Sequence, residues 1–285
     1  MQLEKKNKLD AVILESVNKV QELGYTVLYA ANYGSHNYNL DINNEDYQSD
    51  IDTKVIILPT LEELVNNTKP ISTTIEISTG QCDIKDIRAF IPTLLKANIQ
   101  FLEILCAKSY WINPLYKEDF QWFIDNLENL VQESTNELLK SIKGMCYEKR
   151  KALCHPYPTI KWKIDKWGYD GKQLHHIMRL KDFINSYFLQ GKSFSKSIWY
   201  ENDTGTIALL MRAKLNEYSL EEAVKNAEIY CGLVEAQVNQ LTNDNTNASY
   251  FKEQYRIKAN EIIINSIKRK VLEEENDKSN YSKLQ

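Results

Sequence analysis

Two acidic side chains stand two positions apart at Asp50 and Asp52, with the apolar Ile51 between them. In an extended strand, residues i and i+2 point to the same face, so we expect the two carboxylates side by side and Ile51 turned into the core. Neighbouring carboxylates repel each other unless a cation neutralises them, and oxygen ligands favour Mg²⁺, with Mn²⁺ as an alternative. The competing interpretation is a pair of solvated carboxylates at the end of a strand.

A Gly-Ser turn, Gly34-Ser35, precedes this acidic pair. Gly34 has no Cβ, so the backbone can come close to a ligand, and Ser35 offers a hydroxyl and an N–H to a phosphate. His36 follows, and we expect it either to contact a nucleotide or to stabilise the turn. A phosphate-binding turn followed by a metal-binding pair suggests nucleotidyl transfer.

The elements that must position these side chains can be predicted from hydrophobic patterning. Residues 25–30 are typical of a strand that leads into Gly34, and residues 53–58 of a strand that carries the aspartates onward. Residues 71–78 and 81–85 predict a hairpin around Thr79-Gly80. An amphipathic helix is expected over 9–23, and from Tyr116 onward the chain is almost entirely helical in pattern.

The predicted fold class is therefore α+β, with a small mixed β-sheet core followed by a C-terminal helical domain. We expect the catalytic domain over residues 1–115, the helical domain over 116–272 and a charged, disordered tail over 273–285. The active site would lie in the cleft between the two domains. Helix 220–241 and the helix around 262–264 could form the core of a bundle or the surface of a dimer, and a polar break separates them at 243–247.

Several motifs together resemble the DNA polymerase beta-type nucleotidyltransferases, and in particular a group of predicted bacterial and phage nucleotidyltransferases. The residues that carry the resemblance are Gly34-Ser35-His36-x-Tyr38, Ser49-Asp50-Ile51-Asp52, Asp86-Ile87-Arg88-Ala89-Phe90, Lys96-Ala97-Asn98, Leu102-Glu103-Ile104-Leu105, and Tyr169-Asp170-Gly171-Lys172 with His176 and Arg179. The resemblance spans about residues 25–240. Asn39 and Ile99 stand where that group has Gly and Pro, which puts the substrate in doubt rather than the chemistry.

The resemblance implies a third catalytic, metal-binding carboxylate on a neighbouring strand. Asp83 is preferred because it lies in the middle of the predicted return strand, whereas Glu76 would lie on the outer strand of the hairpin. Asp86 is expected to be the N-cap of the next helix, although all three remain candidates. In the implied mechanism Asp50 and Asp52 hold the ion of the nucleotide, and Asp52 with Asp83 holds the ion of the acceptor.

A second group of candidate nucleotide-binding residues falls on the helix predicted over 169–189. Lys172, His176 and Arg179 stand at i, i+4 and i+7, so they share one face. Fixed positive charge on that face suits the β- and γ-phosphates of a nucleotide. The competing interpretation is a solvated basic face, with His176 in a structural role.

The implied reaction moves a nucleoside monophosphate from a nucleoside triphosphate such as ATP to an unidentified acceptor and releases pyrophosphate. The acceptor could be an RNA or tRNA end, a protein hydroxyl or a small molecule. A basic, tryptophan-containing segment at 157–167 could stack bases or simply pack on the helical domain. The alternative function is a catalytically inactive nucleotide sensor or partner-binding module on the same fold.

The composition agrees with an ordinary globular protein rather than a nucleic-acid scaffold. The chain has 285 residues, a formal net charge of −4 and 43% hydrophobic residues, enough to bury a sizeable core. Its five cysteines are dispersed and form no Cys-x-x-Cys pair, which indicates reduced thiols. With no secretory signal and no apolar run long enough for a membrane span, we expect a cytoplasmic protein with no membrane partner.

Overall fold

The computed structural model describes residues 2–43, 48–201, 203–242 and 249–283. These residues form a five-stranded mixed sheet in the order β3-β4-β2-β1-β5, and only β2 and β4 pair in parallel. The strands are β1 (Thr26–Tyr33), β2 (Asp52–Leu58), β3 (Ser72–Ile77), β4 (Gly80–Asp86) and β5 (Tyr110–Ile112). The predicted strands and the predicted hairpin are present, and the α+β fold class is confirmed.

Helices make up most of the rest of the chain. They are α1 (Gln2–Glu22), α2 (Ser35–Tyr38), α3 (Leu61–Val65), α4 (Ile87–Leu95), α5 (Ile99–Leu102), α6 (Lys117–Asp125), α7 (Leu127–Glu133), α8 (Thr135–Ala152), α9 (Lys161–Trp167), α10 (Gly171–Ile184), α11 (Phe194–Ile198), α12 (Thr204–Lys214), α13 (Leu220–Leu241) and α14 (Tyr250–Lys283). Two 3₁₀ turns, η1 (Glu103–Cys106) and η2 (Pro114–Tyr116), and a π-helical segment, η3 (Asn185–Leu189), complete the elements.

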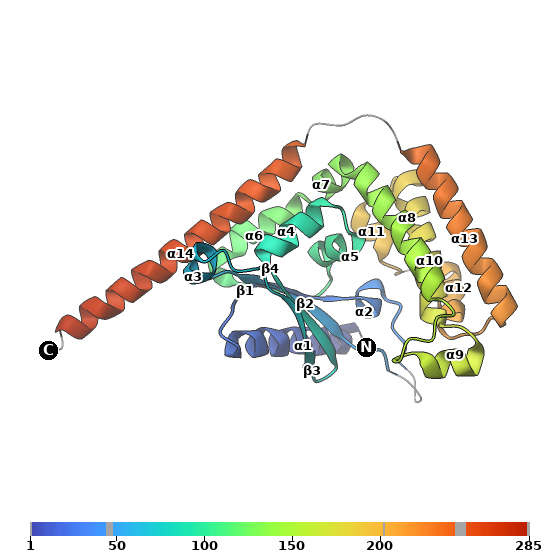
Figure 1. Ribbon diagram of the computed structural model, residues 1–285, viewed down its shortest axis with the longest axis horizontal. Helices are drawn as coiled ribbons and strands as arrows, with labels where there is room; N and C mark the ends of the chain where they lie inside the picture. The colour runs from blue at the N-terminus through green and yellow to red at the C-terminus, as the bar shows by residue number, and fades with distance from the viewer. Residues whose placement is uncertain (1, 44–47, 202, 243–248, 284–285) are drawn as a thin grey trace.

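Helix α1 covers one face of the sheet (Figure 1). Its apolar residues recur every three or four positions, as the amphipathic pattern requires, and pack on the side chains that β1, β2 and β4 direct to that face. A buried hydrogen bond of 2.8 Å between the hydroxyls of Ser16 and Thr53 joins α1 to β2. Because side chains alternate along a strand, Thr53, Val55 and Ile57 face α1, while Asp52, Lys54 and Ile56 face the other way.

The opposite face of the sheet is covered by the helices that follow β4 (Figure 1). Tyr29 of β1 stacks on Phe120 of α6 with ring centroids 4.4 Å apart, and its hydroxyl donates to the carbonyl of Ile104. This hydrophobic core continues without interruption into α8, α10 and α13. The sheet and the C-terminal helices are therefore packed on each other through one continuous core.

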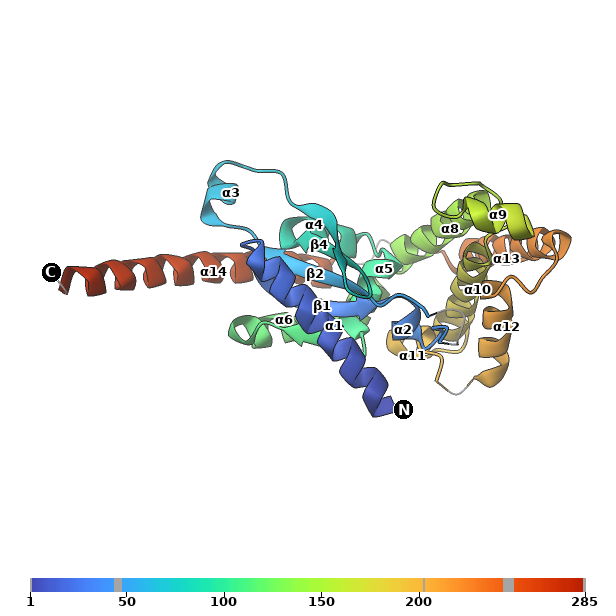
Figure 2. The same cartoon turned by 90° about the horizontal axis from the view of Figure 1, so that it is seen from below.

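The remaining helices divide into two groups. Helices α8 to α13 lie beyond one end of the sheet, whereas α14 runs back along α4, α6 and α7 and extends past the sheet on the other side (Figures 1 and 2). The predicted domain limits remain a prediction. Helix α14 continues through Lys283, into the segment expected to be a disordered tail, and the predicted break at 243–247 falls outside the described residues.

No helix among the described residues has the length and apolar character that crossing a membrane requires.

Candidate active site

The Gly-Ser turn follows the end of β1. Gly34 has a φ of +76°, in the left-handed region, which lets the chain leave the strand and enter the single turn of α2. Asn39 ends α2 with φ 66° and ψ 36°, so the residue that replaces the glycine of the resembling group adopts the left-handed geometry that Asn tolerates. Its side-chain amide donates to the carbonyl of Tyr200, which joins this turn to the C-terminal helices.

Asp52 is the first residue of β2 and pairs with Tyr33 of β1. As expected from the alternation, Ile51 is buried, at 1% exposure, and Asp50 before it is exposed. Burial raises the pKa of the Asp52 carboxyl. A 3.0 Å hydrogen bond from the backbone N–H of Gln81 and the positive charge of Lys172 lower this pKa, but by less than burial raises it. The charges of Asp50 and Asp83 raise it further, so Asp52 lies within electrostatic reach of both acidic groups and of Lys172.

Asp83 lies in the middle of β4, on the same face of the sheet as Asp52. Its Oδ2 atom accepts a 2.7 Å bond from Lys54 and a 3.3 Å bond from the hydroxyl of Tyr33, and its Oδ1 atom accepts from Thr74 at 2.8 Å. Burial alone would raise the pKa of this carboxyl, but the hydrogen bond and charge of Lys54, together with the hydrogen bonds from Thr74 and Tyr33, outweigh it and lower the pKa. A cavity of about 130 Å³ lies beside Asp83.

The two alternative third carboxylates lie in different surroundings. Asp86 is fully buried and caps α4, because its side chain accepts a 2.7 Å hydrogen bond from the backbone N–H of Arg88. It also forms an ion pair with the guanidinium of Arg88. Its expected role as N-cap is confirmed. Glu76 is exposed on the edge strand β3, two strands away from β2. Two strand spacings amount to about 10 Å, which favours Asp83 over Glu76 as the neighbour of Asp52.

The three candidate residues on α10 become more buried from its N-terminal to its C-terminal end. Lys172, at its first turn beside the cap Asp170, is exposed and acts on Asp52, whereas His176 is half-buried. Burial lowers the pKa of His176 well below its usual value, so its imidazole is neutral. Arg179 is buried, with 2% exposure. Of the helix face that Lys172, His176 and Arg179 share, the N-terminal end with Lys172 is exposed and the C-terminal end with Arg179 lies in the core.

Arg179 belongs to a buried polar cluster with Tyr38 and Glu103. Its guanidinium lies 3.9 Å from the centre of the Tyr38 ring, and its Nη1 atom is 4.0 Å from Oε2 of Glu103. The Tyr38 hydroxyl donates to the same carboxylate. Helix α10 is thereby tied to α2, directly behind the Gly-Ser turn.

His36 contacts the chain rather than open space. Its Nε2 atom lies 3.0 Å from the carbonyl oxygen of Ser49, and Nδ1 lies 3.5 Å from Asp41. Burial lowers its pKa. These contacts connect the Gly-Ser turn to the residue before Asp50, as the turn-stabilising interpretation expects.

Sequence reasoning missed Lys214, at the end of α12. Its Nζ atom donates a 2.6 Å bond to the carbonyl of Leu40, and burial together with the charge of Lys172 lowers its pKa to about 8. Lys163 and Asp41 also act on it. No motif surrounds Lys214, and only the fold brings it, across 174 positions of sequence, to the segment between the two N-terminal motifs.

The basic, tryptophan-containing segment forms helix α9 with one exposed ring. Trp162 is 57% exposed, and its ring lies 5.6 Å from that of Trp167. Lys163 pairs with Asp170, the cap of α10, at 3.0 Å. Both earlier interpretations of this segment, base stacking and packing on the helices, remain predictions.

The carboxylates fit a divalent cation only in part. Among the described residues, no group of three His, Cys, Asp or Glu side chains has the geometry of a metal site. Asp50 and Asp52 offer hard oxygen atoms two positions apart, which suits Mg²⁺ with further ligands from phosphates. The oxygens of Asp83, in contrast, are engaged with Lys54, Tyr33 and Thr74.

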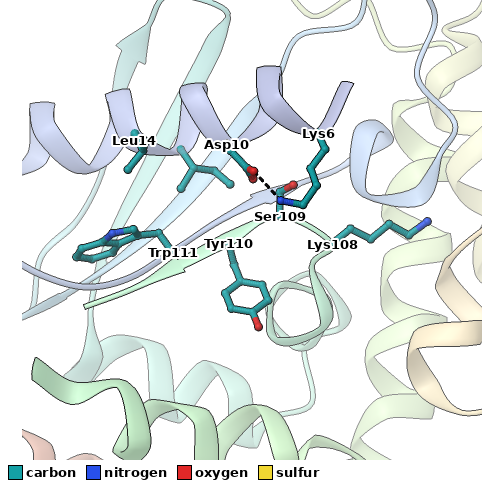
Figure 3. Close-up of a pocket in the computed structure, with 8 residues that line it drawn as sticks. Lys6, Asp10, Leu14, Lys108, Ser109, Tyr110 and Trp111 are labelled. Carbon is teal, nitrogen blue, oxygen red and sulfur yellow. Dashed lines mark hydrogen bonds and ion pairs between the residues drawn. The ribbon is translucent and has the colours of Figure 1, made fainter. Parts of the chain in front are cut away.

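Among the described residues, three cavities larger than the one beside Asp83 are lined by none of the predicted site residues. One of about 400 Å³ lies between α1 and β5 and is lined by Lys108, Tyr110 and Trp111 together with Lys6 and Asp10, which form an ion pair (Figure 3). Another, of about 550 Å³, separates α4 from α14. The smaller cavity of about 130 Å³ is instead lined by Asp83 and Lys54.

No protein-family model and no curated protein matches the sequence. Among solved structures, the chain is similar to a nucleotidyltransferase-like protein from Exiguobacterium sibiricum, with 12% sequence identity and a TM-score of 0.31 over 80% of this chain and 75% of that one. The site residues, rather than this similarity, carry the functional inference.

Proposed function

We propose that the protein is a nucleotidyltransferase that moves a nucleoside monophosphate from a nucleoside triphosphate to an acceptor hydroxyl. The observation that carries the proposal is the position of Asp52 at the start of β2, where Asp50, Asp83 and the Lys172 end of α10 all act on its carboxyl. The Gly34-Ser35 turn lies at the end of the strand that pairs with β2. Carboxylates for a cation and lysines for phosphates are the two requirements of this chemistry.

The residues have separate tasks in the reaction. Asp50 and Asp52 would hold Mg²⁺, or Mn²⁺ in its place, which when bound offsets the negative charge of the phosphates. Lys172 and Lys214 would orient the β- and γ-phosphates. The acceptor oxygen forms a bond to the α-phosphorus, the bond from that phosphorus to the bridging oxygen breaks, pyrophosphate leaves and the hydroxyl proton passes to solvent.

Incubation of the full chain with Mg²⁺ and each labelled nucleoside triphosphate tests this proposal. We expect pyrophosphate release that disappears in an Asp50→Ala, Asp52→Ala double variant. Addition of total RNA and cell protein then shows which kind of acceptor gains the label.

A catalytically inactive nucleotide sensor is the second candidate, because the ion pair of Asp83 with Lys54 leaves one of the three expected carboxylates engaged. Nucleotide binding without pyrophosphate release would favour the sensor. A chain that neither binds nor turns over any of the four nucleotides would contradict both functions.

A further inference from the structure

Lys54 and Asp83 are neighbours on adjacent strands. In the parallel pairing of β2 with β4, Lys54 stands opposite Asp83, and both side chains point to the face that also carries Asp52. The register therefore places the ammonium of Lys54 next to Asp83. This is the edge of the site where a second cation would be shared between Asp52 and Asp83.

The ammonium of Lys54 is held firmly in this position. Only 6% of its side chain is exposed, and Nζ lies 2.7 Å from Oδ2 of Asp83. The same atom lies 3.9 Å from the centre of the Tyr33 ring and 4.9 Å from that of Phe101. Aromatic faces attract cations, so the surroundings stabilise the charge of Lys54 in addition to its carboxylate partner.

Both oxygens of the Asp83 carboxylate already accept hydrogen bonds. Oδ2 accepts from Lys54 and Tyr33, and Oδ1 accepts from Thr74. A divalent cation at Asp83, whose side chain is 36% exposed, would have to displace this buried ammonium from the carboxylate. The Lys54 ammonium, whose side chain is only 6% exposed, would then lose its carboxylate partner, and leaving a buried charge without a partner is strongly unfavourable.

We infer that the centre takes one divalent cation, at Asp50 and Asp52, and that the Lys54 ammonium supplies the fixed positive charge beside Asp83 in place of a second cation. This inference rests on the proposed function, because it assumes the cation site at Asp50 and Asp52. Lys54 is thus a positioning residue that keeps Asp83 neutralised on the acceptor side.

Titration of the full-length chain with Mn²⁺, followed by the electron paramagnetic resonance signal of free Mn²⁺, tests the inference without any assay of activity. We expect one bound Mn²⁺ per chain, lost in the Asp50→Asn, Asp52→Asn double variant and unchanged in Asp83→Asn. Lys54→Met should gain a second Mn²⁺, because it frees Asp83, whereas the charge-conserving Lys54→Arg and the neighbouring Lys85→Met should keep one.

The number of bound Mn²⁺ distinguishes a failure of this inference from a failure of the proposed function. Two bound Mn²⁺ in the unmodified chain, with one lost in Asp83→Asn, would overturn the inference and leave the proposed function intact. One Mn²⁺ in a folded Lys54→Met variant would also overturn it, and where that variant does not fold, the Asp83→Asn count decides. No bound Mn²⁺ in the unmodified chain, either alone or with a non-hydrolysable nucleoside triphosphate present, would contradict the proposed function itself.

Discussion

The backbone of Gly80 lies directly against the carboxylate of Asp52. A Cβ atom added at Gly80 would stand 2.8 Å from Oδ1 of Asp52 and 2.9 Å from the carbonyl oxygen of Ile51. The next residue, Gln81, donates its backbone N–H to the same Oδ1 atom at 3.0 Å. The turn of the β3–β4 hairpin thus fixes one oxygen of Asp52, and its shape depends on the absence of a side chain at position 80.

Replacing Gly80 with Ala should therefore displace Asp52. Because the backbone of Ile51 blocks the new methyl group as well, the strand has to move, at a cost of about 1–3 kcal/mol in the free energy of unfolding. We expect weaker Mn²⁺ binding in titrations and a lower urea midpoint. Gly144→Ala in α8 is the matched control, because its Cβ meets nothing within 4 Å and should stabilise the helix by about 0.5–1 kcal/mol. Unchanged Mn²⁺ affinity in Gly80→Ala would show that the hairpin does not position Asp52.

Asp52→Asn should abolish nucleotidyl transfer without loss of stability. The raised pKa of Asp52 means that the folded protein disfavours its charge, so a neutral amide of the same shape does not destabilise the fold. Loss of the cation ligand should lower the rate roughly 100-fold or more. Pyrophosphate release and the urea midpoint, measured on the same preparation, check both halves of this prediction. A variant that transfers as fast as the parent would mean that the assigned carboxylates are wrong.

The sequence alone predicted the local part of the site, because that part depends on short-range patterns. The alternation around Ile51, the hairpin that carries Asp83 and the cap at Asp86 follow from spacing and burial within a few residues. The surroundings of each side chain could not be predicted in this way. The partner of Asp83 is set by the register between β2 and β4.

The same distinction applies to the helical half. The shared face of Lys172, His176 and Arg179 is a property of any helix, but its burial depends on what packs there. Tyr38 and Glu103, from distant segments, enclose Arg179 and leave Lys172 in solvent. Phosphate binding by His176 and Arg179 remains a prediction, which their burial does not favour.

Arg179→Met should destabilise the protein strongly. Removing the guanidinium leaves the carboxyl of Glu103 buried beside Tyr38 without its cation, and breaking such a pair costs about 3–5 kcal/mol. Lys172→Met, on an exposed position of the same helix, should change stability by no more than about 0.5 kcal/mol while weakening nucleotide binding. Urea denaturation and nucleotide titrations of both variants provide the comparison. A fully stable Arg179→Met variant that has lost nucleotide binding would instead favour direct contact of Arg179 with phosphate.

Lys214 should make phosphate binding depend on pH near 8. Its pKa of about 8 in the folded protein lies below the value of about 10.4 for an unperturbed lysine. Between about pH 8 and about pH 10.4, Lys214 is protonated in the unfolded chain but not in the folded chain. The contribution of Lys214 to the free energy of unfolding therefore increases as the pH rises through this range. Binding of a polyanion should change in the opposite direction, because the Lys214 ammonium loses its charge above about pH 8 and then no longer attracts the anion.

Calorimetric titration with inorganic tripolyphosphate between pH 6.5 and 9.5, a range of about 1.5 units on either side of that pKa, tests this expectation. The affinity should fall as the pH rises through about 8 in the unmodified chain, and much of this fall should be absent in Lys214→Met. Lys117→Met, an exposed lysine at the start of α6, should behave like the parent and thereby controls for the loss of one positive charge. An equal fall in Lys214→Met would assign the pH dependence to another group, and Lys214 would then serve only to join α12 to the carbonyl of Leu40.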